Sequence, residues 1–301
     1  MLQPHVSAGW MACVGYGLRA ARQHWRLVAG LWLLLVTSAS LASAPASRWL
    51  HDALAASPAA DVLRERFDLI LVMEALRDTA GGVSPIVLTP LFGIIVLMLV
   101  INPFVAGGTL TVVSWPDRAP GRFFDGGRMF YWRFVKLFAV VIVGAAILTT
   151  GGVLLTTLLF STAWDAGRET LAWGIAASAA GLGVGLWIAC ILALDYARIH
   201  VVCLDSQRMI HAWRAALQFI IGHLWSVLAL ALTFGVVTFA LVLLSHPLDL
   251  VWPASNGVWI ALGLILHQAI AFARVWLRVA WLSAALHLTR ARDSFDPTLI
   301  A

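Results

Sequence analysis

Charged side chains are scarce in this sequence. Of its 301 residues, 12% are Asp, Glu, Lys or Arg and 61% are apolar, whereas ordinary soluble domains carry about a quarter charged residues. The chain therefore has too little polar surface to cover a water-soluble core. Catalytic signatures such as H-E-x-x-H, G-x-S-x-G and G-x-x-x-x-G-K-[ST] are also absent from the sequence. No pair of carboxylates lies within an apolar run to act as acid and base, so we expect neither an enzyme nor a cofactor or metal site.

Cysteine is also rare. The sequence holds three, Cys13, Cys190 and Cys203, without the C-x-x-C spacing of metal or redox sites. We expect all three to be free thiols, because they lie within predicted helices or on the side assigned below to the cytoplasm.

Six long uncharged runs account for the low charge. They cover residues 27–44, 86–113, 137–160, 171–194, 224–245 and 258–273. Most reach or approach the ~20 apolar residues that cross a ~30 Å hydrocarbon core, and a helix satisfies its own backbone hydrogen bonds in lipid. Trp25, Trp132 and Trp225 fall at predicted span ends, as an interfacial aromatic belt requires. The sequence predicts an all-α fold, a polytopic transmembrane helix bundle of about six spanning helices.

Basic residues are divided unevenly between the two sides of this bundle. The segments before the first run, between the second and third, between the fourth and fifth, and after the sixth hold fifteen of the twenty basic residues and six of the fifteen acidic ones. The fifteen are Arg19, Arg22, Arg26, Arg118, Arg122, Arg128, Arg133, Lys136, Arg198, Arg208, Arg214, Arg274, Arg278, Arg290 and Arg292. The positive-inside rule predicts both termini in the cytoplasm of a bacterial inner-membrane protein. Because the basic residues are shared among four juxtamembrane segments, a nucleic-acid partner is not expected.

The expected organisation has three parts. Residues 1–26 form a cytoplasmic amphipathic segment, residues 27–290 the six-helix transmembrane domain, and residues 291–301 a cytoplasmic tail. Within the domain, residues 45–85 form an external connection with its own helix, for which Asp61 is a suitable N-cap.

The start of the chain has two interpretations. Arg26, the apolar residues 27–36 and Ala42-Ser43-Ala44 resemble a signal peptide with an A-x-A cleavage site. The long arginine-bearing segment ahead of them favours a retained membrane helix.

Three short sequences suggest an internal repeat. RAARQ at residues 19–23 precedes the first apolar run, RMFYW at 128–132 the third, and RAALQ at 214–218 the fifth. They indicate three parallel two-helix hairpins, each introduced by a short amphipathic helix on the cytoplasmic side. Generic arginine and tryptophan flanking of membrane helices is the alternative.

One charged cluster is predicted at the cytoplasmic ends of two spans. Asp195 and Arg198 close the fourth span, while Arg274 and Arg278 are i, i+4 neighbours at the end of the sixth. We expect Asp195 to pair with Arg274 or Arg278, because unpaired charges at this depth are costly. A site for anionic lipid or phosphate, built from the spare arginines, is the alternative.

Polar and small residues within the spans provide further candidates. Asn102-Pro103 interrupts the second apolar run and can either kink the helix or break it into a transporter-like site. His267 and Gln268 lie near the middle of the sixth run, and a neutral histidine bonded across helices is the expected role. Ala177, Gly181 and Gly185 have the small-xxx-small spacing that permits close helix approach.

With the sequence DYARIHVV at residues 195–202 and the arginine-flanked spans, the chain resembles a group of six-helix bacterial inner-membrane proteins. It also resembles the membrane domain of some glycerophosphodiester phosphodiesterases, mainly over residues 126–290. The catalytic metal-binding domain of those enzymes has no counterpart here, so no catalytic residue carries over.

From these features we expect a non-enzymatic scaffold or component of a membrane protein complex. The alternative is a transporter or lipid-handling protein with a site between hairpins. The expected partners are membrane lipids, anionic ones among them, and other membrane or cytoplasmic proteins.

Overall fold

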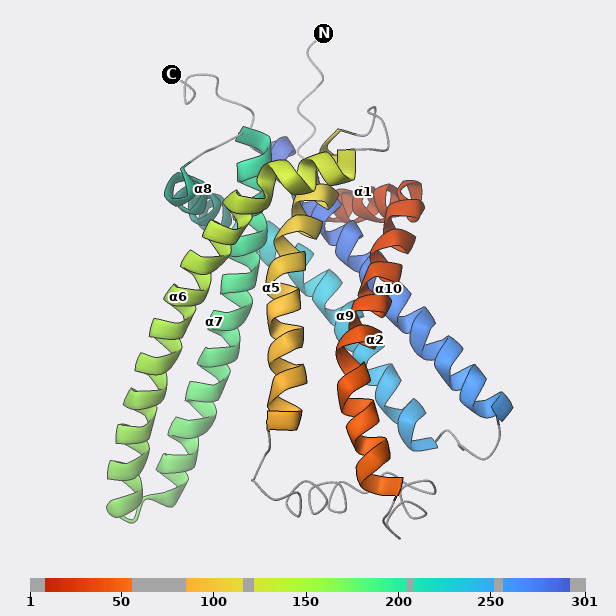
Figure 1. Cartoon of the computed structure of the whole chain (residues 1–301). Coiled ribbons are helices and arrows are strands. Elements are labelled where there is room, and N and C mark those ends of the chain that lie inside the picture. Colours follow the sequence, from red (N-terminus) through yellow and green to blue (C-terminus); the bar gives the residue numbers. More distant parts are fainter. Residues whose placement is uncertain (1–8, 56–84, 116–121, 205–207, 252–256, 293–301) are drawn as a thin grey trace. The chain divides into compact units, whose positions relative to one another are not determined.

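The chain is helical throughout the computed structural model, which describes residues 9–55, 85–115, 122–204, 208–251 and 257–292. The helices are α1 (Trp10–Gln23), α2 (Trp25–Ala55), α5 (Pro85–Ser114), α6 (Arg122–Asp165), α7 (Glu169–Leu204), α8 (Met209–Gly222), α9 (Leu224–Val251) and α10 (Gly257–Arg292). These residues contain no strand (Figure 1). The predicted all-α fold is confirmed.

Each of the six apolar runs lies in one helix, namely α2, α5, α6, α7, α9 or α10. Among the described residues, four segments are long and apolar enough to cross a membrane: Arg122–Asp165, Glu169–Leu204, Leu224–Ser245 and Val258–Arg292. The pair Trp10–Gln23 and Trp25–Leu41, bent by 76°, passes the same test together, and Leu99–Ser114 of α5 is a shorter apolar helix. The protein is therefore membrane-spanning.

Several helices extend beyond the apolar runs that predicted them. α6 begins at Arg122 and α10 continues to Arg292, so their charged ends are still helical. α2 continues through Pro45 to Ala55, so the helix extends beyond the expected end of the first span, and the boundary at residue 45 stays a prediction. Hydropathy marks where a span can leave lipid, whereas the backbone hydrogen-bond ladder can continue past that point. The helix predicted after Asp61 lies outside the described residues.

The chain forms two compact units. Unit 1 consists of Met1–Ala20, Pro103–Phe234 and Val279–Ala301, and unit 2 of Ala21–Asn102 and Gly235–Arg278. α6, α7 and α8 belong wholly to unit 1, and α2 to unit 2, whereas α1, α5, α9 and α10 contribute residues to both. Within unit 2, the rings of Trp32 and Phe272 meet edge to face with centroids 6.1 Å apart. The predicted boundaries at residues 26 and 290 stay predictions.

α6 and α7 form a long hairpin in unit 1 (Figure 1). Its turn is a Schellman motif, in which Gly167 N–H donates to the Trp164 carbonyl and Arg168 N–H to the Ala163 carbonyl, each at 2.9 Å. Gly167 has φ +70°, a conformation that favours glycine. Two alanines buried near the turn, Ala163 and Ala172, let the helices approach closely there.

The end of α5 crosses the start of α6 through two pairs of glycines. A Cβ atom on Gly107 would lie 3.0 Å from the Gly126 carbonyl oxygen, and one on Gly108 would lie 2.6 Å from the Phe123 carbonyl oxygen. A Cβ on Gly127 would lie 2.7 Å from the Phe104 ring. Glycine is therefore needed here for close packing between helix backbones.

Short helices precede two of the long ones, as the predicted repeat requires. α1 and α8 each contain 14 residues, and a single histidine, His24 or His223, separates each from the next helix. When the two breaks are aligned, residue 24 corresponds to residue 223. The RAARQ and RAALQ matches instead align residue 19 with residue 214. The two alignments differ by about one helical turn. The third predicted short helix is instead the N-terminal part of α6.

The glycine crossing provides a stability prediction. Gly108→Ala should destabilise the protein by about 1–3 kcal/mol, because the new methyl group meets backbone that cannot rotate away. Gly144→Ala in α6 is the matched control, since a Cβ there meets nothing within 4 Å and alanine is the better helix former. Thermal unfolding in mild detergent measures both. Equal effects of the two substitutions would contradict the close crossing.

Candidate functional site

The C-terminal end of α7 is the most enclosed part of unit 1. Every residue from Ala193 to Val202 is buried, which means that this helix is covered on all sides rather than along one face. Phe134 of α6, Phe219 of α8 and Trp281 of α10 are among the large side chains that contact it. Figure 1 shows α8 beside this end of α7.

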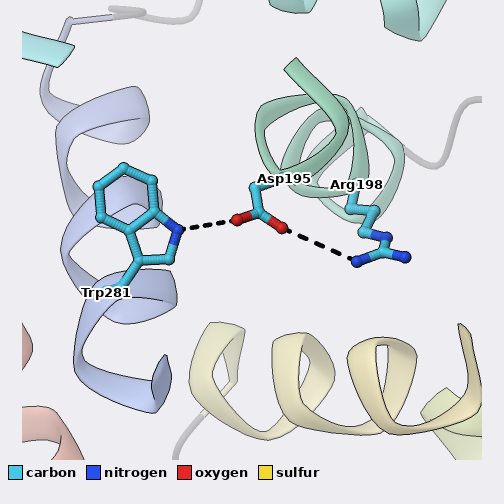
Figure 2. Close-up of polar contacts among 3 residues, drawn as sticks. All are labelled: Asp195, Arg198 and Trp281. Carbon is cyan, nitrogen blue, oxygen red and sulfur yellow. Dashed lines mark hydrogen bonds and ion pairs between the residues drawn. The ribbon is translucent and has the colours of Figure 1, made fainter. Parts of the chain in front are cut away.

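Asp195 and Arg198 form an ion pair inside this enclosed region. Asp195 is 1% exposed and Arg198 2% exposed. The Asp195 Oδ1 lies 3.8 Å from Arg198 Nη1, and its Oδ2 accepts a 2.9 Å hydrogen bond from Trp281 Nε1 (Figure 2). The indole donor is neutral, so it stabilises the carboxylate without adding a charge. The bond joins α7 to α10 across 86 positions of sequence.

The guanidinium of Arg198 also faces an aromatic ring. Its central carbon lies 5.7 Å from the ring centroid of Phe134 on α6, within the range of a cation–π interaction. A buried charge is tolerated only when partners replace the water that it lost. For Arg198, the Asp195 carboxylate on α7 and the Phe134 ring on α6 replace part of the lost hydration.

Two further polar side chains lie beside the ion pair. Tyr196 is fully buried, with its ring 5.3 Å from that of Phe219 and 6.4 Å from that of Trp281, centroid to centroid. Its hydroxyl has no hydrogen-bond partner among the described residues. His200 is buried one turn further along, with its ring 6.0 Å from Phe219. The arrangement binds helix to helix through mixed polar and aromatic contacts.

The four residues of the predicted charged cluster are divided between the two units. Asp195 and Arg198 of unit 1 form an ion pair, and Arg274 and Arg278 are exposed residues of unit 2. A pair between either of them and Asp195 stays a prediction. Trp281 follows Arg278 at i+3 and Arg274 at i+7, so these three residues share one face of α10. The hydrogen-bond donor to Asp195 therefore lies on the face from which the sequence predicted an arginine partner.

Trp281 and Tyr196 were not predicted from the sequence, because only side chains of opposite charge were considered as partners of Asp195. An indole N–H that can reach a carboxylate in an apolar region was the available signal.

The predicted intramembrane residues Asn102, His267 and Gln268 lie in unit 2. Asn102 is exposed, and α5 continues through it and Pro103, so the helix is not broken there and the kink stays a prediction. One proline removes one helical hydrogen bond, and the neighbouring bonds hold the helix together. His267 Nδ1 lies 2.8 Å from the Gly263 carbonyl oxygen of its own helix, a bond other than the predicted one across helices. The Gln268 Oε1 has no hydrogen-bond partner among the described residues.

Cys13, Cys190 and Cys203 form no disulfide within the described residues, as the sequence predicts. Within the described part of the chain, no three His, Cys, Asp or Glu side chains gather closely enough to hold a metal ion.

No protein-family model matches this chain, and neither a curated protein nor a solved structure matches it.

The ion pair and its indole donor provide the second stability prediction. Asp195→Ala leaves a buried guanidinium without its carboxylate and should cost ~3–5 kcal/mol. Trp281→Phe removes a hydrogen bond to a charged acceptor and should cost ~1.5–3 kcal/mol. The double variant should cost less than the sum, because both changes remove the same contact.

Unfolding in mild detergent measures the three variants against the wild type. Trp187→Phe, at an exposed position of α7, controls for loss of an indole. Strict additivity of the two substitutions would mean that Asp195 and Trp281 do not interact.

Proposed function

We propose that this membrane-spanning protein is a non-enzymatic component of a bacterial inner membrane that docks other membrane or cytoplasmic proteins. Its role would be that of a scaffold or a subunit of a larger complex. The proposal rests on one feature of unit 1, the uncovered middle of the α6–α7 hairpin.

The middle of this hairpin presents apolar side chains outward. No residue from 146 to 162 of α6 or from 173 to 192 of α7 is buried. Large apolar side chains such as Leu154, Leu158, Leu182 and Trp187 are exposed there. In a membrane such surfaces contact either lipid or the helices of another protein, and close packing with a second helix requires small residues.

Small residues are present on α7 at the spacing that such packing needs. Ala177, Gly181 and Gly185 are all exposed, and a Cβ atom on either glycine would meet nothing within 4 Å. The half-exposed Ile175 and Leu186 lie on the other side of the helix. The stripe therefore has room for the backbone of a partner helix.

The buried ion pair also supports a structural role. Asp195 and Arg198 are held within unit 1 by each other and by aromatic side chains. Removing one partner of such a pair is strongly destabilising, so an intact pair favours the arrangement of helices that encloses it. A rigid unit of this kind suits a docking platform.

The alternative remains a transporter or lipid-handling protein. The buried amide oxygen of Gln268 favours it, because a polar atom within a span is costly unless it serves a purpose. A solute or lipid that raises the melting temperature of the wild type but not of Gln268→Leu would support this alternative over docking.

The orientation belongs to the same proposal. The fifteen-to-five division of basic residues supports cytoplasmic termini. Reporter fusions after Ala301 and within residues 56–84 test it: the first should give a cytoplasmic signal and the second an external one. The reverse pattern would overturn the orientation.

Affinity purification from native membranes tests the docking function. The wild-type chain, solubilised in mild detergent, should retain at least one protein partner in fixed stoichiometry. Gly181→Leu should lose a partner bound at the stripe, because the larger side chain separates the helices. Gly183→Leu, the same change two residues on, is the control, because this glycine is also exposed with nothing within 4 Å of its Cβ position. A wild-type chain that purifies without any stoichiometric protein would contradict the proposal.

A further inference from the structure

The short helix α8 has a position fixed by its covalent connection. It ends at Gly222, and one residue, His223, separates it from Leu224, where the candidate span Leu224–Ser245 begins. A span that starts at Leu224 enters the hydrocarbon there, so the helix ahead of it lies at the membrane surface. Trp225, at the junction, is 83% exposed and has the side chain most typical of that boundary.

α8 has two apolar faces, of which only one is used inside the protein. Ala212, Ala216 and Phe219 are buried, and Phe219 contacts Tyr196 of α7. On the opposite face, Ile210 is 63% exposed and Ile221 75% exposed. A second apolar face on a helix at the membrane surface is the mark of interfacial insertion.

A basic residue lies between these two isoleucines. Ile210, Arg214 and Ile221 fall within about 40° of one another around the helix. Arg214 is exposed, as is Arg208 at the N-cap of α8. The acidic residues nearest to Arg214 in the sequence are Asp205 and Asp249, so no acidic residue of α8 itself offsets the positive charge of this face.

We propose that the exposed face of α8, formed by Ile210, Arg214, Gln218 and Ile221 together with Trp225, binds anionic phospholipid headgroups of the adjoining leaflet. The isoleucines and the indole enter the boundary between headgroups and acyl chains, while the Arg214 guanidinium binds lipid phosphate. Charge complementarity and the fixed surface position of α8 favour lipid over a protein partner. This surface is distinct from the α7 stripe and does not depend on the proposed docking function.

α1 repeats part of this construction. It has the same length as α8, and Trp25, which follows its terminal histidine, is exposed. Met11, Arg19 and Arg22 are exposed along α1. No acidic residue occurs in the sequence before Asp52, so neither short helix contains an acidic residue that would offset its exposed arginines.

Lipid titration of the full-length protein tests the proposal. Purified protein, delipidated in a neutral detergent, is titrated with phosphatidylglycerol or with phosphatidylcholine, and bound lipids are counted by native mass spectrometry. The wild type should prefer phosphatidylglycerol. Arg214→Gln should weaken phosphatidylglycerol binding about fivefold, the factor expected for one arginine near an anionic surface. Phosphatidylcholine binding should be unchanged.

Two further variants separate a site from total charge. Arg214→Lys keeps the charge and should retain the preference for phosphatidylglycerol. Arg168→Gln removes an exposed arginine at the other end of α7 and should behave as the wild type. Equal losses for Arg214→Gln and Arg168→Gln would overturn the proposal.

Photo-cross-linking in cells identifies the occupant directly. A photoreactive residue at the exposed position Gln218 should yield adducts with the mass of a lipid. A protein adduct there in place of lipid would overturn the lipid assignment.

Discussion

The constraint on which unit 1 depends is the burial of two opposite charges at the end of α7. Asp195 and Arg198 are almost completely buried, so each needs partners from the protein. Asp195 and Arg198 pair with each other within one turn of α7. Trp281 of α10 donates a hydrogen bond to Asp195, and the Phe134 ring of α6 faces Arg198. The electrostatic requirement of one helix thereby fixes which faces of its neighbours are turned toward it.

Close approach between helix backbones supports the same arrangement elsewhere in unit 1. Gly107 and Gly108 of α5 face Gly126 and Phe123 of α6, and Gly17 of α1 lies against Ala280 and Ala284 of α10. In lipid the hydrophobic effect does not drive helices together, so contact area and hydrogen bonds must do so. By contrast, the glycines in the middle of α7 face open space. Small residues thus serve internal packing at one end of the hairpin and leave room for other molecules further along.

The sequence predicted the helices better than the contacts between them. Every apolar run lies in a helix, because hydrocarbon allows few other backbone conformations. α2 and α6 extend beyond their apolar runs, since charge and proline mark the limits of a span but not of backbone hydrogen bonding. The sequence placed Asp195 and Arg198 in one charged cluster but predicted Arg274 or Arg278 as the partner of Asp195, whereas the ion pair described in unit 1 is with Arg198. Trp281 was missed because its donor is uncharged, and the roles of Gly107 and Gly108 depend on which helix crosses them, which spacing alone does not reveal.

Hydrogen exchange at the Trp281 indole tests the central claim most directly. In the folded protein its N–H is bonded to Asp195 and the side chain is 6% exposed, whereas Trp225 is 83% exposed. Nitrogen–proton spectra in detergent micelles, assigned by Trp281→Phe and Trp225→Phe, should show slow exchange for Trp281 and rapid exchange for Trp225. Slow exchange that becomes rapid in Asp195→Ala is the predicted result. Exchange of Trp281 as fast as that of Trp225 in the wild type would contradict a buried carboxylate–indole bond.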